Sequence, residues 1–104
     1  QQRVALARTV AQAPDVILAD EPVASLDPIT AKQIMDDFKR INETENITII
    51  ANMHHVDLAL QYAHRVIGIR EGKIVFDGPV EKVNDDVLTH VYGRQLTDKD
   101  FKGV

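Results

Sequence analysis

The chain has 104 residues, room for one domain at most, and its hydrophobic fraction of 44% is typical of a globular fold. Its net charge of −4, from 12 basic and 16 acidic residues, argues against a nucleic-acid-binding surface. It has no cysteine, which excludes disulfides and cysteine-ligated metals, and no apolar run approaches the roughly 20 residues of a membrane-spanning helix. Any membrane association is therefore expected to run through a partner.

Hydrophobic periodicity predicts alternating helices and strands in the first half of the chain. A helix of small apolar residues is expected over 1–12 and an apolar strand over 16–20. Asp27 and Pro28 are typical of a helix start, an N-cap acid before a proline, for a helix that runs to about residue 46. This helix is expected to bury one apolar stripe, formed by Ala31, Ile34, Phe38 and Ile41.

The second half is expected to hold a β-branched strand, a short helix, two hairpin strands and a weak helical region, over residues 47–52, 56–63, 65–70, 73–77 and 80–92. Glu71 and Gly72 form the two-residue turn of the hairpin. Residues 94–104 are charged and read as a solvated tail. Strands separated by a crossover helix predict a parallel pair covered by helices, so the fold class is α/β with a partial, mainly parallel sheet.

The most informative feature is the apolar strand that ends at Asp20, Glu21 and Pro22. A short apolar run of this kind predicts a strand buried on both faces. It places the two acids at the carboxyl edge of the sheet, where open α/β sheets bind ligands. Because buried acids are costly without a cation or a reacting group, such a pair can hold Mg²⁺ and polarise a water. The alternative is a polar strand end closed by a turn proline.

Four elements, taken together, resemble the ATP-binding cassette (ABC) ATPases. Gln1 and Gln2 open a segment similar to the residues after the family signature, and Asp20-Glu21-Pro22 resembles the end of Walker B. Residues 24–27 resemble the D-loop, and His54 follows a strand as the family's switch histidine does. The resemblance covers about residues 1–79 and implies a partial P-loop NTPase fold of the ABC type with a C-terminal hairpin.

The resemblance implies a role for each element in phosphoryl transfer. Asp20 would bind Mg²⁺ directly or through a water, and Glu21 would orient or deprotonate the attacking water. His54 would contact the γ-phosphate of ATP and Glu21, which its ring can do as a hydrogen-bond donor. Gln1 and Gln2 flank the signature, whose amides would bind the γ-phosphate.

Two of these residues have other interpretations. Asp27 is expected to cap the following helix, and the resemblance also implies a place at the dimer interface opposite the partner's nucleotide. His54 is alternatively a surface histidine, or part of a metal site with His55, although no third ligand is evident.

The chain departs from the family pattern in what it lacks. It contains no Gly-x-x-x-x-Gly-Lys-Ser/Thr loop and no glutamine loop, and it starts at Gln1 rather than at methionine. We therefore expect residues 1–93 to be the C-terminal part of an ABC ATPase domain without its Walker A half, and 94–104 to be a tail. The 104-residue chain alone is expected to bind ATP poorly and to hydrolyse none detectably.

The implied function is that of the ATP-hydrolysing, energy-coupling subunit of an importer, on the cytoplasmic face of the cell membrane. Its partners would be a second ATPase subunit, permease subunits and, indirectly, a substrate-binding protein. Segments 54–60 and 65–73 look most like phosphonate importer ATPases, although amino-acid, metal and lipoprotein transporters share much of the pattern.

Three other functions fit part of the sequence. A soluble member of the family would work on ribosomes or DNA repair complexes, which the acidic composition disfavours. A phospho-acceptor signalling domain would need an aspartate where the strand at 47–52 ends in Asn52. A chain that serves only interaction would self-associate, because the missing half of the fold should leave apolar surface exposed along residues 16–20.

Overall fold

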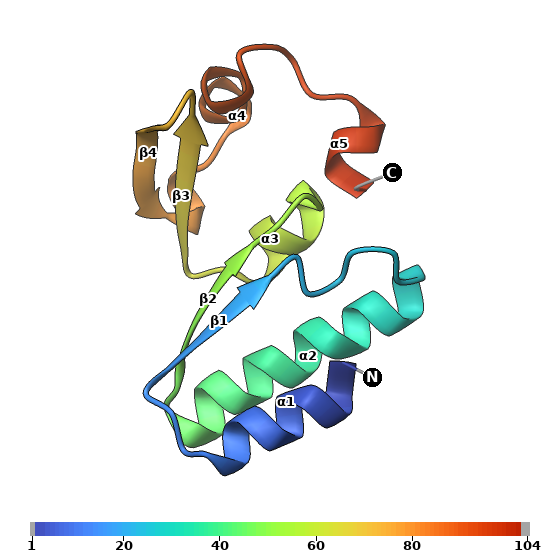
Figure 1. The fold of residues 1–104 in the computed structure, drawn as a ribbon. Coiled ribbons are helices and arrows are strands. Elements are labelled where there is room, and N and C mark those ends of the chain that lie inside the picture. The colour runs from blue at the N-terminus through green and yellow to red at the C-terminus, as the bar shows by residue number, and fades with distance from the viewer. Residues whose placement is uncertain (1, 103–104) are drawn as a thin grey trace. The chain divides into compact units, whose positions relative to one another are not determined.

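The computed structural model describes residues 2–102, with side chains from residue 5 onward. The chain divides between His54 and His55 into two compact units. The first unit combines helices with a parallel strand pair, and the second combines a hairpin with short helices (Figure 1).

The first unit is built around a parallel pair of strands with helices on one side. Its elements are α1 (Gln2–Ala11), β1 (Val16–Asp20), α2 (Pro28–Glu45) and β2 (Thr48–Asn52). The register pairs Val16 with Thr48 at one end and Asp20 with Asn52 at the other. Both α1 and α2 lie on the same side of this ribbon (Figure 1). The predicted parallel pair with flanking helices is confirmed.

Helix α2 begins and ends where local chemistry requires. The Asp27 carboxylate accepts hydrogen bonds from the Thr30 amide at 2.9 Å and from the Thr30 hydroxyl at 2.7 Å. Pro28 follows in the first turn, where a missing amide hydrogen costs nothing. The helix ends at Asn46, whose φ of 54° is the left-handed conformation common at helix C-termini.

The core of the first unit lies between α2 and the strands. The predicted stripe is buried at Ala31, Ile34 and Phe38 and half-buried at Ile41. Further buried apolar residues of this unit are Ile17, Val23, Met35 and Ile47. Because the polypeptide between β1 and α2 carries Val23, the loop that follows β1 is anchored in this core.

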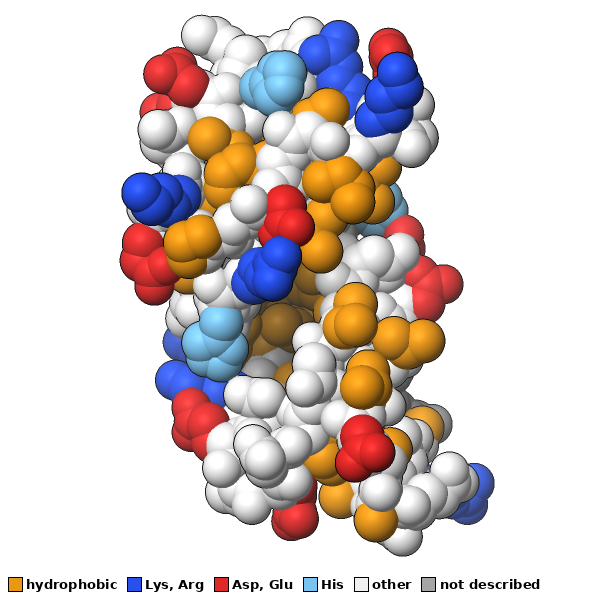
Figure 2. All heavy atoms as spheres, turned by 90° about the vertical axis from the view of Figure 1, so that its left-hand side faces the viewer, with side chains coloured by type: hydrophobic (Ala, Val, Ile, Leu, Met, Phe, Trp, Pro, Cys, Tyr) orange, Lys and Arg blue, Asp and Glu red, His pale blue; other side chains and the backbone are white. Residues whose placement is uncertain are grey.

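The expectation that β1 is buried on both faces is wrong. Ile17 is buried, but Leu18 is 77% exposed and Ile50, its partner on β2, is 56% exposed. Successive side chains of a strand point to opposite faces, and both helices of this unit cover the same face. The other face therefore leaves its apolar side chains open. Apolar side chains reach the surface in several places in Figure 2.

The second unit is organised by an antiparallel hairpin. Its elements are α3 (Val56–Tyr62), β3 (Arg65–Arg70), β4 (Lys73–Pro79), the 3₁₀ helix η1 (Val80–Lys82), α4 (Asp85–Tyr92) and α5 (Asp98–Lys102). Glu71 and Gly72 have φ of 52° and 76°, as both central residues of a type I′ turn require. The predicted hairpin is confirmed.

Close packing holds α4 against the hairpin of this unit. A Cβ atom at Gly68 would collide with the side chain of Val91 on α4, so only glycine allows this approach. Across the hairpin, the Arg65 guanidinium donates to both carboxylate oxygens of Asp77 at 2.7 Å. This pairing raises the pKa of Arg65 and lowers the pKa of Asp77, in both cases chiefly through the shared hydrogen bonds.

The segment expected to be a solvated tail contains the short helix α5, which contacts α3. The charges here pair locally: Arg94 donates to both oxygens of Asp100 at 2.8 Å, and the Thr97 amide donates to Asp100 at 2.7 Å. These hydrogen bonds, that from Arg94 first, hold the pKa of Asp100 well below its usual range. Composition alone does not reveal such pairing, because it depends on which charges the turn brings together.

Candidate functional site

The carboxyl ends of β1 and β2 carry three of the polar residues that the sequence singled out, Asp20, Glu21 and His54. Asp20 is the last residue of β1 and pairs with Asn52, the last residue of β2. Glu21 follows β1 directly, and His54 follows β2. Since parallel strands end at the same edge of a sheet, pairing the strands brings these residues together.

Glu21 and His54 are in direct contact. His54 Nε2 lies 2.5 Å from Glu21 Oε1, and the two side chains are 75% and 38% exposed respectively. A ring N–H of histidine can donate to a carboxylate oxygen, so the two groups are within hydrogen-bonding reach. The acid and the histidine that the motif pattern assigned to one reaction therefore form one pair at the strand edge.

The backbone of Glu21 is in a sparsely populated conformation. Its φ of 47° is left-handed, which costs a non-glycine residue roughly 1–3 kcal/mol and persists only where the surrounding structure enforces it. The Glu21 amide donates to Asn52 Oδ1 at 2.6 Å and to the Asn52 carbonyl oxygen at 3.2 Å. One residue of β2 thus supplies both acceptors for this amide.

Asn52 is the contact residue that reasoning from the sequence missed. From the sequence, Asn52 was noted only because it stands where a phospho-acceptor signalling domain would need an aspartate. The signal that could have found it is its position: with the two strands parallel, the last residue of β2 stands opposite the last residue of β1. A side-chain oxygen at that position can reach the chain where it leaves the partner strand.

The loop after β1 is compact and connects the site to α2. Pro22 is buried and Val23 is 1% exposed, so the loop is fixed to the core immediately after Glu21. The Ala24 amide donates to the Glu21 carbonyl oxygen at 3.1 Å. This anchoring limits the freedom of the Glu21 backbone from its C-terminal side.

Asp27 lies at the far end of this loop as the N-cap of α2. Its side chain is exposed and accepts the two hydrogen bonds from Thr30. These bonds, the backbone one first, lower the pKa of Asp27. The capping role is confirmed by this geometry, whereas the role at a dimer interface stays a prediction.

Two predicted nucleotide-binding residues have no described side chain. Gln1 lies outside the described residues. Gln2 is the first residue of α1, and its side chain lies outside the described part of the chain. Their predicted role beside a phosphate therefore stays a prediction.

The donor set at the strand edge suits Mg²⁺ with a nucleotide. Asp20 is exposed there, and Mg²⁺ in nucleotide sites takes one or two carboxylates together with phosphate oxygens and water. Among the described residues there is no group of three or more histidines, aspartates and glutamates arranged to hold a metal ion without a ligand's help. One exposed carboxylate is compatible with this chemistry, and the role of Asp20 as a Mg²⁺ ligand stays a prediction.

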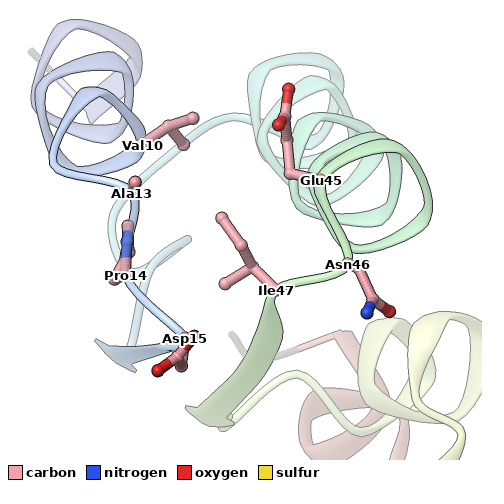
Figure 3. A pocket seen from close by; sticks show the side chains of 7 residues that line it. All are labelled: Val10, Ala13, Pro14, Asp15, Glu45, Asn46 and Ile47. Carbon is pink, nitrogen blue, oxygen red and sulfur yellow. The ribbon is translucent and has the colours of Figure 1, made fainter.

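A pocket of about 300 Å³ lies elsewhere in the first unit. It is lined by Val10, Ala13, Pro14, Asp15, Glu45, Asn46 and Ile47 (Figure 3). Asp15 and Ile47 precede β1 and β2, so this pocket is at the amino ends of the strands, opposite the edge that carries Glu21. Ligands of parallel sheets bind at the carboxyl ends, and the pocket is therefore separate from the candidate site.

Comparison with curated proteins finds relatives that are named as phosphonate-import ATP-binding proteins. The chain is 57% identical over 104 residues to the phosphonates import ATP-binding protein PhnC of Staphylococcus saprophyticus, covering 100% of this chain and 40% of that protein. It is 56% identical over 103 residues to the protein of the same name from Shouchella clausii, covering 99% of this chain and 39% of that protein. The chain thus spans about 40% of the length of these relatives.

Solved structures with a similar fold include an ATP-binding cassette and part of an ABC transporter complex. A dimeric ATP-binding cassette in a post-hydrolysis state with ADP and Pi is 34% identical, with a TM-score of 0.67 over 76% of this chain and 34% of that one. CbiO1 from Clostridium perfringens, part of the ABC transporter complex CbiONQ, is 30% identical, with a TM-score of 0.74 over 85% of this chain and 36% of that one.

No family model matches the chain. Within residues 2–102, none of the helices has the length and apolar character needed to span a bilayer. The sequence identity extends over nearly all of this chain, and the fold agrees with that of the solved structures. Both findings agree with the motifs. We conclude that this chain has the fold of an ATP-binding cassette and is similar in sequence to about 40% of the length of the phosphonates import ATP-binding proteins.

Proposed function

We propose that the protein containing this chain is the ATP-hydrolysing, energy-coupling subunit of an ABC importer. The observation that carries the proposal is the contact between Glu21 and His54 at the carboxyl edge of a parallel strand pair. An acid and a histidine held together at such an edge suit a reaction that activates water beside a phosphate.

In the proposed mechanism Glu21 accepts a hydrogen bond from the attacking water and orients it toward the γ-phosphate of ATP. Little covalent chemistry is needed from the protein, because phosphoryl transfer is accelerated mainly by positioning and by charge stabilisation. His54 holds one oxygen of Glu21, so the other oxygen of that carboxylate is left to face the water. With a proton on both ring nitrogens, His54 would also provide its second N–H as a donor for the γ-phosphate.

Asp20 is the proposed Mg²⁺ ligand, and the bound ion would neutralise charge on the β- and γ-phosphates. The position of Asp20 next to Glu21 in the chain supports this division of roles. Asp20 is exposed at the end of β1, whereas Glu21, whose backbone is left-handed, contacts His54. Two adjacent acids thereby serve two different functions.

The proposed cargo is a phosphonate or phosphate ester, and the relatives named phosphonates import ATP-binding protein support it. The proposed partners are a second copy of the ATPase subunit, a permease and, indirectly, a substrate-binding protein. The dimeric state of a related cassette supports the first of these. This assembly would place the subunit on the cytoplasmic face of the membrane, and the 104-residue chain alone is proposed to be inactive.

The test is ATP hydrolysis by an ATPase of the relatives' full length that carries these residues, reconstituted with its permease. Glu21→Gln is expected to leave ATP binding within about twofold and to slow hydrolysis by roughly 10²–10⁴-fold, the range for losing a general base. Glu45→Gln, an exposed acid at the other end of the unit, is the matched control and should keep full turnover. Unchanged turnover in Glu21→Gln would refute the assignment, and hydrolysis that phosphonate with its binding protein does not stimulate would refute the cargo.

A further inference from the structure

We infer that Asn52 is a positioning residue that sets the direction of the Glu21 carboxylate, an inference that rests on the proposed function. The direct evidence is the short hydrogen bond from the Glu21 amide to Asn52 Oδ1, at 2.6 Å. The partner is an amide N–H, which can only donate, so the oxygen of the Asn52 side chain must face Glu21.

Asn52 holds the Glu21 amide with two acceptors. Its backbone carbonyl oxygen accepts the same N–H at 3.2 Å and continues the pattern of the parallel pair by one residue. The side-chain oxygen is the nearer acceptor by 0.6 Å, from 3.2 and 2.6 Å. The side chain therefore adds a contact that the strand pairing by itself does not provide.

This contact matters because Glu21 is left-handed, with φ of 47°. A left-handed residue points its side chain differently from an extended one, and the conformation persists only where the surroundings enforce it. Pro22 and Val23 are buried and restrain the chain after Glu21. Asn52 restrains the backbone N–H of Glu21 itself. The two restraints together direct the carboxylate to His54 Nε2.

Asn52 is thus placed to act through Glu21 rather than on the nucleotide. Asn52→Ala removes the nearer acceptor and keeps the backbone one. Glu21 is then expected to sample other conformations, and its carboxylate to spend less time against His54. Since this affects water activation and not the binding of ATP, kcat should fall about 10-fold or more while KM stays within twofold.

The experiment uses the full-length ATPase and five variants, one of which is Glu21→Gln alone. Asn52→Ala is measured in the wild-type and in the Glu21→Gln background, the latter by single-turnover hydrolysis with enzyme in excess. Asn52→Ser retains a side-chain oxygen without a new charge and should recover part of kcat. Asn42→Ala is the matched control: it removes a 2.8 Å hydrogen bond from an asparagine side chain to the Ile47 carbonyl oxygen in the same unit, away from the site.

The inference predicts that Asn52→Ala has no further effect once Glu21 is glutamine, and that Asn42→Ala keeps kcat. It also predicts faster hydrogen exchange of the Glu21 amide in Asn52→Ala, a readout that needs no activity. A full effect in both backgrounds, or a rise in KM without a fall in kcat, would overturn it, because Asn52 would then act on the nucleotide. Unchanged exchange at Glu21 would also overturn it. If the wild-type protein does not hydrolyse ATP, the proposed function fails, and the exchange measurement still decides whether Asn52 holds Glu21.

Discussion

The imidazole of His54 and the carboxylate of Glu21 meet at 2.5 Å across the carboxyl ends of two parallel strands. Each residue follows its own strand, and the helix α2 lies between them in the chain. The pair therefore exists only because β1 and β2 are aligned so that they end together. The predictions below concern this pair, the helix start that follows it, the core beneath it and the open strand face.

The two adjacent histidines should differ in their effect on hydrolysis. In the full-length ATPase, His54→Ala removes the partner of Glu21 and is expected to lower kcat by about 10²-fold, a typical loss for a group that acts in proton transfer or its orientation. His55→Ala is the control, since His55 begins the second unit as the N-cap of α3 without a side-chain capping bond. Steady-state turnover of both variants measures the difference. A larger loss from His55→Ala would show that the switch role belongs to His55 and not to His54.

The N-cap of α2 should give the chain an acid-dependent stability. The folded-state pKa of Asp27 is lowered, chiefly by the Thr30 amide, so the unfolded state binds more protons at low pH. The stabilisation from its charge is therefore present above the ordinary aspartate pKa of about 4 and is lost as the pH falls through the folded value. Asp27→Asn keeps a capping oxygen without the charge. Urea midpoints at pH 6 and about pH 2.5 should differ less in this variant than in the wild type, and an equal difference would contradict the prediction.

Core and surface positions of the same helix should respond differently to truncation. Ile34 is 2% exposed, so Ile34→Ala is expected to lower the free energy of unfolding by roughly 2–5 kcal/mol, from lost burial and a residual cavity. Ile29 is 74% exposed, and Ile29→Ala should change it by no more than about 0.5 kcal/mol. Chemical denaturation of both variants makes the comparison. Similar losses at the two positions would mean that Ile34 and Ile29 do not differ in burial as the structure shows.

The open face of the parallel pair should make the 104-residue chain self-associate when it is alone. Leu18 is 77% exposed and Ile50 is 56% exposed beside it, and contiguous apolar surface of this kind drives association. Light scattering is expected to give a mass above that of the monomer. Leu18→Lys should shift the population toward monomer, while Ile29→Lys, at an exposed apolar residue outside the strands, should not. A wild-type chain that is monomeric and binds no hydrophobic dye would contradict this prediction.

Local rules were enough for many elements of the fold. The strand at 16–20, the helix start at Asp27 and Pro28, and the turn at Glu71 and Gly72 are all where the sequence predicted them. Each depends on the conformational preferences and hydrogen-bonding groups of neighbouring residues, which a sequence displays directly. The candidate acids and the histidine were likewise visible as motifs, and the parallel pair followed from the crossover helix.

Tertiary structure alone decided three other features: which face of β1 is open, the left-handed backbone of Glu21, and the contact between Glu21 and Asn52. A strand with one covered face can have the same apolar sequence as a strand with two covered faces. The hydrophobicity of the strand itself does not show which other elements pack on it. The Asn52 contact depends on the register of two strands that are separated in the chain by a helix. Such a contact is set by how the elements pack, and no pattern within either strand encodes it.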